Sequence, residues 1–150
     1  MKKIIFLIIF SLSGCSSHHD ILPIAPPCIH PYFGKRFIIG DNGYRVWVDS
    51  KLYDVPEGFI TDLVSIPRPF WLFVSPLHST VISPSILHDY FYSGTIKVSR
   101  KFADDVFYNH MIKDGASKYK AWIFWAGVRL FGWISFKGKY DENKGLDKKG

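Results

Sequence analysis

Cysteine is scarce in this sequence, with only Cys15 and Cys28 among 150 residues. Two cysteines exclude a disulfide-dense scaffold and a zinc site built from four thiolates. Long apolar runs are also lacking, since the run from Ile4 to Phe10 is far shorter than the ~20 residues of a membrane-spanning helix. The sequence has no Ser-His-Asp order, nucleotide-binding loop or His-Glu-x-x-His motif, so the common hydrolase, nucleotide and metalloprotease signatures are missing.

What is present indicates one compact globular domain. Hydrophobic residues make up 47% of the chain, charged residues 21% and aromatic residues 17%, a composition that argues against disorder and supplies a core of large rings. The formal net charge is +6, but much of the basic excess lies in Lys2, Lys3 and the lysines after residue 136. The body is therefore close to neutral, and no nucleic-acid partner is expected.

The amino terminus has the three parts of a secretory signal: basic Met1–Lys3, apolar Ile4–Phe10, and Leu12-Ser13-Gly14-Cys15. The last four residues resemble a bacterial lipobox. That resemblance implies removal of residues 1–14, acylation of Cys15, and attachment to a lipid bilayer. Ser16 rather than Asp follows the cysteine. The resemblance to enteric lipoproteins therefore further implies that the protein is located in the cell envelope, at the outer membrane where the host has one. The alternative is an ordinary signal peptide with a chance cysteine.

The residues after the signal divide into a tether, a domain and a tail. Residues 15–33 are rich in Pro, Ser and His, which predicts an extended tether between the lipid and the domain. Cys28 has no partner cysteine, so we expect it to be buried. Residues 34–136 form the single domain, and residues 137–150 form a polar basic tail.

The domain is predicted to be α+β, a small antiparallel meander of about four strands packed against three helices. Strands are expected at residues 36–39, 44–48, 51–55 and 59–61, with a hairpin turn at Asn42-Gly43. Helices are expected from Ser83 to about Gly94, from Ser99 to about Asp114, and from Ser117 to Trp133, each opened by a serine cap. The third is very apolar, and a buried core helix is favoured over a membrane-facing one.

Four runs along the domain resemble DUF1353, a phage and prophage family known only as a domain of unknown function. They are Pro56 to Pro67 (Pro-x-Gly-Phe-x-Thr-Asp-x-x-Ser-x-Pro), Leu87 to Tyr92 (Leu-His-Asp-Tyr-x-Tyr), Ser99 to Phe107 (Ser-Arg-x-x-Ala-Asp-x-x-Phe) and Val128 to Trp133 (Val-Arg-Leu-Phe-Gly-Trp). The resemblance covers roughly residues 36 to 134. It implies a phage or prophage origin, but it does not imply any particular activity.

The run around His88 places chemically useful groups together. His88 and Tyr92 are four residues apart and share a helix face, while Asp104 comes from the next helix. An imidazole that meets a carboxylate is the minimum for an oriented general base. Asp89 points about a quarter turn away, where Asp62 or a loop carbonyl would join it as ligands for calcium.

The His-Asp-x-x-Tyr spacing also resembles secreted phospholipase A2 enzymes. That resemblance implies that His88 is the base, Asp89 the calcium ligand, and Tyr92 and Asp104 the residues that orient His88. The chain departs from that family because the Gly-rich calcium loop and the paired helix cysteines are missing.

A structural interpretation stands beside the chemical one. The polar side chains of these segments would form a buried hydrogen-bond network that joins strand, loop and helices; its members are His88, Asp104, Thr61, Asp62, Ser65 and Arg100. Two functions follow. The first is a non-enzymatic envelope lipoprotein that binds an envelope protein and modifies the host surface or excludes a second infection. The second is an anchored hydrolase that acts on lipid or cell wall.

Overall fold

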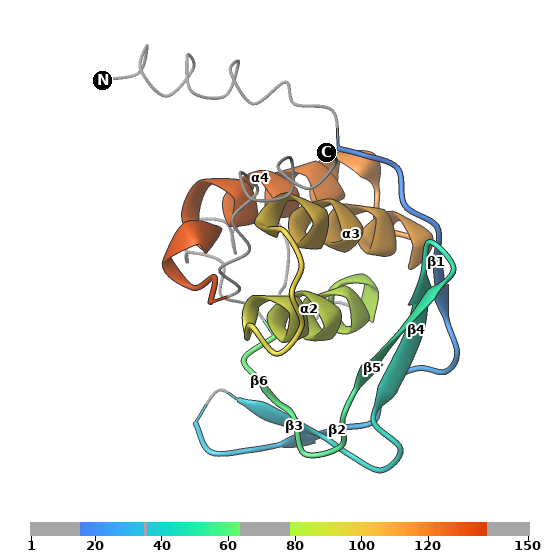
Figure 1. The fold of residues 1–150 in the computed structure, drawn as a ribbon, viewed down its shortest axis with the longest axis vertical. Coiled ribbons are helices and arrows are strands. Elements are labelled where there is room, and N and C mark those ends of the chain that lie inside the picture. The colour runs from blue at the N-terminus through green and yellow to red at the C-terminus, as the bar shows by residue number, and fades with distance from the viewer. Residues whose placement is uncertain (1–15, 35, 64–78, 138–150) are drawn as a thin grey trace, which may run out of the picture.

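The computed structural model describes residues 16–34, 36–63 and 79–137. The α+β prediction is confirmed, with six short strands in two antiparallel sheets and three helices within these ranges. Cys15, Ser65 and the tail after residue 137 lie outside the described residues, so the predictions made for them are not addressed by the structure. Figure 1 shows the three helices stacked beside the strands, with β1, β4 and β5 running along one side of the helical layer.

The first sheet contains β1 (Ile21–Pro23), β4 (Tyr44–Val48) and β5 (Lys51–Val55) in the order β1-β4-β5. Alternation along β4 buries Tyr44, Val46 and Val48 against the helices and leaves the residues between them exposed. Across the sheet Leu22 pairs with Trp47, and Trp47 pairs with Leu52. These three side chains form an exposed apolar row on the outer face of the sheet.

The second sheet contains β2 (Ile29–Pro31), β3 (Phe37–Ile39) and β6 (Ile60–Thr61) in the order β2-β3-β6. All four strands expected from the sequence form, but the single meander is wrong. The turn at Asn42-Gly43 passes the chain from one sheet to the other instead of closing a β3–β4 hairpin. The physical reason is that β1 and β2 supply β4 and β3 with partner strands of their own.

The segment expected to be a free tether is therefore partly built into the body. Both β1 and β2 lie within residues 15–33, and their prolines stand at strand ends, where a missing backbone donor costs little. Cys28, expected to be buried, is exposed because it lies at the edge of the second sheet, with its Sγ 3.6 Å from Nε2 of His30. The tether prediction thus missed both strand pairings.

The helices are α2 (Ser79–Tyr92), α3 (Arg100–Lys113) and α4 (Lys118–Phe131), followed by the short 3₁₀ turn η2 (Gly132–Ile134). The predicted caps are confirmed at Ser99 and Ser117, whose hydroxyl oxygens accept bonds from the N–H of residues 102 and 120. Helix α2 begins four residues before Ser83, and Pro84 lies inside it instead of at its first position. Pro84 is the sixth residue of α2, so it lacks the N–H that would otherwise bond to the carbonyl four residues earlier, and this weakens the first turns of the helix.

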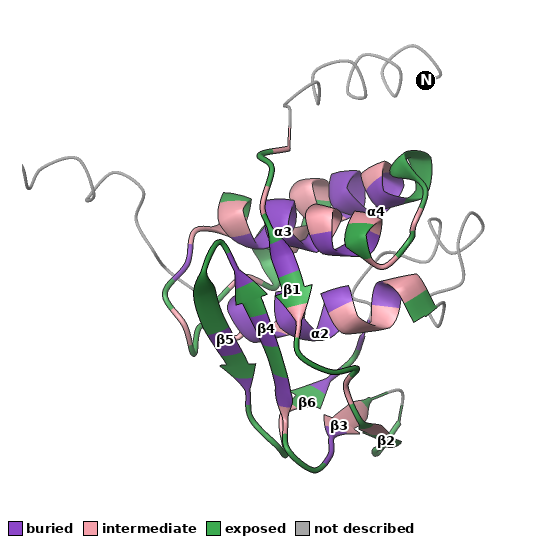
Figure 2. Ribbon diagram, turned by 90° about the vertical axis from the view of Figure 1, so that its right-hand side faces the viewer, coloured by how far each residue is buried: buried purple, intermediate pink, exposed green. Residues whose placement is uncertain are grey.

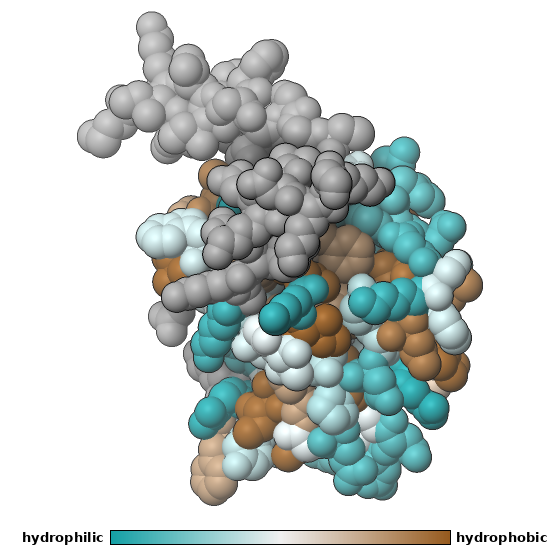
Figure 3. Space-filling model, in the orientation of Figure 1, coloured by the Kyte–Doolittle hydropathy of each residue, from teal (hydrophilic) through white to brown (hydrophobic). Residues whose placement is uncertain are grey.

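Helix α3 packs on both α2 and α4 and lies between them in the helical layer. Figure 2 shows buried residues along all three helices. The α4 residues Ala121 to Gly127 are almost all buried, as expected of a core helix. Among the described residues no helix combines the length and apolar character needed to cross a membrane. On the face seen in Figure 3, hydrophobic residues appear in small groups between hydrophilic ones.

Candidate functional site

Asp104 is the centre of a buried cluster that joins three helices. Its carboxylate is fully buried, and Oδ1 lies 3.0 Å from Nε2 of His88 and accepts a 2.5 Å bond from the hydroxyl of Tyr92. Its Oδ2 accepts a 3.0 Å bond from Nη1 of Arg129 on α4. Local sequence explains this arrangement, because His88 and Tyr92 are one turn apart on α2 and Asp104 follows the Ser99 cap by little more than one turn.

The cluster keeps Asp104 ionised. Burial by itself would raise the pKa of this carboxyl group, but the bonds from His88, Tyr92 and Arg129 outweigh burial and lower its pKa below the usual value. Burial and the neighbouring Asp104 carboxylate raise the pKa of the Tyr92 hydroxyl, which remains a donor. Arg100 adds positive charge 4.0 Å from Oδ2 of Asp104 and donates a 2.9 Å bond to the carbonyl of Arg129.

The imidazole of His88 is held on three sides. Its ring centroid lies 4.0 Å from that of Tyr92 and 4.8 Å from that of Phe107, and the residue is 7% exposed. Because a carboxylate only accepts hydrogen bonds, Nε2 carries the proton that faces Asp104. The second nitrogen, Nδ1, is then the one that carries a lone pair.

His88 borders an open cleft of about 500 Å³ between α2, the end of α4 and the second sheet. Its walls carry apolar side chains, among them Phe59, Ile60 and Val128. Two basic residues, Arg36 and Lys137, also line the cleft. The described residues of its lining are Arg36, Phe59, Ile60, Asp62, His88, Asp89, Tyr92, Ser93, Gly127, Val128, Phe131, Gly132, Ser135 and Lys137. The oriented imidazole therefore borders a space whose walls combine apolar surface with both basic and acidic side chains.

A second polar group lies in the same cleft. The carboxylate of Asp89 accepts a hydrogen bond from the hydroxyl of Thr61, and that hydroxyl oxygen accepts a 3.0 Å bond from the N–H of Leu63. Burial and, after it, the negative charge of Asp62 raise the pKa of Asp89 to about 7. Asp62 and Asp89 are thus neighbours, as the sequence predicted.

Among the described residues, the donor set around Asp89 falls short of a calcium site. Calcium takes six to eight oxygen ligands. The described residues contain no group of three or more Asp, Glu, His or Cys side chains arranged to hold a metal ion. Two carboxylates and one hydroxyl fall short of such a site, so we assign no step of the chemistry to a metal.

The structure divides the predicted polar network into two groups. His88, Tyr92, Asp104 and Arg100 meet around one carboxylate, while Thr61, Asp62 and Asp89 meet around another. Sequence reasoning missed Arg129 as the main cationic partner of Asp104. The available signal was that Arg129 is the single charge between Ala121 and Phe136, which an apolar core helix keeps only when the charge is paired.

A family model described as a protein of unknown function, DUF1353, matches residues 41–128. The chain belongs to the DUF1353 family. The matched range includes His88, Tyr92, Asp89 and Asp104, so both polar groups lie in the DUF1353 part of the molecule. The strands β1, β2 and β3 precede it. Searches of curated proteins and of solved structures find no match to the chain.

Proposed function

We propose that this DUF1353 protein is an envelope lipoprotein, anchored through acylated Cys15, with a hydrolytic centre formed by His88 and Asp104. One observation supports the catalytic part: His88 lines an open cleft, and its Nε2 lies 3.0 Å from the fully buried, ionised carboxylate of Asp104. The pairing of His88 with Asp104 and Tyr92 is also the arrangement that the phospholipase A2 resemblance implies.

The chemistry follows from the orientation of the imidazole. With Nε2–H donated to Asp104, the lone pair of Nδ1 takes a proton from a water molecule whose oxygen bonds to an acyl carbon. The buried Asp104 carboxylate stabilises the imidazolium that results. When the carbon–oxygen bond to the leaving group breaks, Nδ1–H returns the proton to the leaving oxygen. The products are a carboxylic acid and an alcohol, and His88 is again neutral.

The cleft favours a lipid ester as the substrate class. Its apolar residues Phe59, Ile60 and Val128 would contact an acyl chain, and Arg36 and Lys137 would pair with a phosphate or another anionic group. An envelope anchor would place such substrates within reach of the protein.

Fatty-acid release from phospholipid micelles by the purified lipoprotein tests the proposal. We expect His88→Asn to lower kcat by about 10²-fold or more, because general-base catalysis contributes about 10² to 10⁴. The matched control is His110→Asn, since His110 is also a buried histidine but contacts Tyr44 instead of Asp104. Circular dichroism checks that each variant folds. A wild type without hydrolysis, or a folded His88→Asn variant with full activity, would contradict the hydrolase proposal.

A second candidate is a binding protein without catalysis. The observation that favours it is that Asp104 has no exposed surface and ties α2, α3 and α4 together, as a purely stabilising network would. In this case a protein of phage or prophage origin would bind an envelope protein, and so modify the host surface or exclude a second phage.

Phage plating on cells that express the lipoprotein separates the two candidates. Under the binding candidate, cells with a folded His88→Asn variant resist the second phage as well as cells with the wild type do. Under the hydrolase proposal, resistance is lost together with fatty-acid release. If His88→Asn and Asp104→Asn both fail to fold, the cluster is structural and the binding candidate is retained.

A further inference from the structure

The residues that immediately follow Cys15 are fastened to the body. The N–H of Ser17 donates a 3.2 Å bond to Oδ2 of Asp105, and Nζ of Lys101 bonds to both the same carboxylate oxygen and the hydroxyl of Ser17. Nδ2 of Asn109 donates a 2.7 Å bond to the carbonyl of Ser17. Three polar contacts to one face of α3 therefore hold Ser17.

The attachment continues without a break into the first sheet. Nδ1 of His19 lies 2.5 Å from Oδ2 of Asp49, and the N–H of Asp20 donates a 3.0 Å bond to Oδ1 of the same carboxylate. The ring of His19 also packs edge-on against Phe102, at 5.0 Å between centroids. The peptide between Cys15 and Ser17 can extend by about 7 Å at most. Acyl chains on Cys15 would therefore hold this face of the body directly at the lipid surface.

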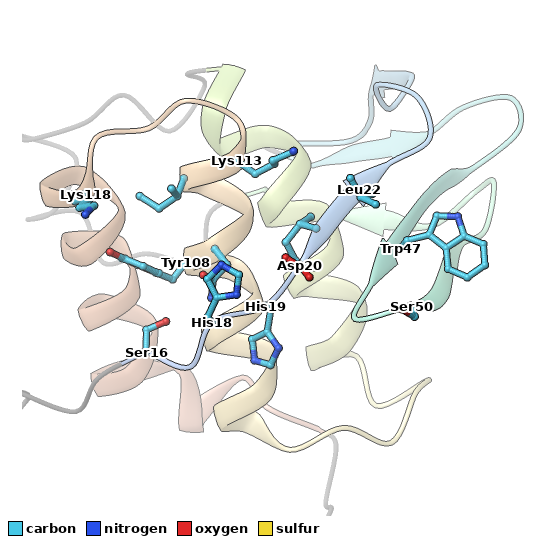
Figure 4. Close-up of a pocket in the computed structure, with 13 residues that line it drawn as sticks. Ser16, His18, His19, Asp20, Leu22, Trp47, Ser50, Tyr108, Lys113 and Lys118 are labelled. Atoms are coloured by element: carbon cyan, nitrogen blue, oxygen red, sulfur yellow. The ribbon is translucent and has the colours of Figure 1, made fainter.

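A groove of about 970 Å³ opens beside this attachment point, between β1, β4 and the carboxyl-terminal half of α3. Figure 4 shows Ser16 at its edge, Lys113 and Lys118 on one flank and Trp47 on the opposite flank. Tyr108, Ile112 and Leu22 add apolar surface between them. Among the described residues of the lining Asp20 is the one acidic residue, so with Lys113 and Lys118 these residues carry a net positive charge.

The apolar surface extends from the groove along the outer face of the first sheet. Leu22, Trp47 and Leu52 stand in one cross-strand row and are 57%, 41% and 40% exposed. Tryptophan beside aliphatic residues, with lysines nearby, is the composition of surfaces that rest in the headgroup region of a bilayer. Lysines at such a surface attract anionic lipids.

We propose that the groove and the Leu22–Trp47–Leu52 row bind the anionic phospholipids of the bilayer that holds Cys15. Lys113 and Lys118 pair with lipid phosphates, and Trp47 and Leu22 contact the glycerol and upper acyl region. This inference rests on the proposed lipid anchor, because the short link from Cys15 to Ser17 is what presses this face, and no other, against the membrane.

Quenching of tryptophan emission by brominated lipids tests this orientation. The acylated protein is reconstituted in phosphatidylethanolamine vesicles with and without phosphatidylglycerol. We expect Trp47→Phe to remove most of the quenchable emission. Trp133→Phe is the matched control, since Trp133 is 68% exposed but lies in η2, and it should leave the quenching unchanged. Quenching that persists in Trp47→Phe, or that disappears in Trp133→Phe, would overturn the proposal.

The lysines are tested by the response to phosphatidylglycerol. Anionic lipid should increase the quenching of the wild type, and Lys118→Gln should reduce that increase. Lys97→Gln, in the loop between α2 and α3, should retain it. An equal response of the two variants would refute the phosphate contacts.

Mass spectrometry of the amino-terminal peptide separates a failure of the anchor from a failure of the groove. If Cys15 is not acylated, both the anchor and the groove proposal fail. If Cys15 is acylated and Trp47 is not quenched, the anchor stands and only the orientation is refuted.

Discussion

The hydroxyl oxygen of Tyr44 lies 3.1 Å from Nε2 of His110, and the two rings are stacked at an angle of 9°. Both residues are buried, one on β4 and the other on α3, so the contact joins the first sheet to the central helix. Nδ1 of His110 is the one buried side-chain nitrogen or oxygen without a hydrogen-bond partner among the described residues. Burial lowers the pKa of His110 to about 3.

The first prediction is an acid-dependent loss of stability that originates at His110. The unfolded chain binds a proton at His110 below about pH 6.5, whereas the folded state resists protonation until about pH 3. The free energy of unfolding is therefore unaffected above pH 6.5 and decreases as the pH falls from 6.5 toward 3. Protonation of His110 in the unfolded chain should lower the free energy of unfolding by about 3 kcal/mol between pH 7 and pH 4.

Urea unfolding of the wild type and of His110→Gln, each at several pH values, measures that contribution as a difference. The difference is needed because burial raises the pKa of the neighbouring Asp114 to about 6, and this carboxyl group acts in the opposite direction over part of the range. If the free energy of unfolding depends on pH in the same way in both proteins, His110 is not the source of the acid-dependent loss of stability.

The second prediction concerns the charge balance at Asp104. Arg129→Met should destabilise the fold by about 2 kcal/mol, because it leaves a buried carboxylate without its main cationic partner. This value is less than for a wholly buried pair, since the Arg129 side chain is 25% exposed. Chemical denaturation measures the loss, with Lys97→Met as the control.

A double variant tests the mechanism of that loss. If the cost comes from an uncompensated charge, Arg129→Met should destabilise an Asp104→Asn background much less than it destabilises the wild type. Equal destabilisation in both backgrounds would assign the effect to lost packing of the arginine side chain.

The third prediction concerns the turn that separates the two sheets. Gly43 has φ of +64°, and a Cβ atom at this position would lie 2.4 Å from the carbonyl oxygen of Val55. Gly43→Ala should destabilise the fold by about 2–3 kcal/mol, from backbone strain plus this clash. Gly58 is the matched control, because its φ is +81° but no atom lies within 4 Å of its added Cβ.

Gly58→Ala should therefore cost only about 1 kcal/mol, the strain of the left-handed backbone alone. Thermal unfolding of both variants gives the comparison. If Gly58→Ala proves as harmful as Gly43→Ala, the close approach to Val55 contributes nothing measurable.

Short-range features of this fold could be predicted from the sequence. The Ser99 and Ser117 caps depend on bonds to residues three positions away, and both form as expected. The meeting of His88, Tyr92 and Asp104 was also predictable, because one turn of helix and one short loop determine it.

Long-range pairings could not be predicted in the same way. Nothing local in residues 15–33 signals that β1 pairs with β4, and the prolines of that segment favour an extended chain with or without a partner. The choice of Arg129 as the partner of Asp104 depends on how α4 packs on α3, which the periodicity of either helix leaves open. The same holds for Asp105 and Ser17, which are 88 positions apart.

The pairing of β1 with β4 affects how this protein can be made in the laboratory. A recombinant form trimmed to begin at residue 34, where the proline-rich stretch ends, would lose β1 and β2 and leave β4 and β3 each with a bare edge. Unpaired edge strands promote aggregation, because the edge of one molecule can pair with the edge of another. A soluble version should begin no later than Ser16, and purification tags belong at the carboxyl terminus.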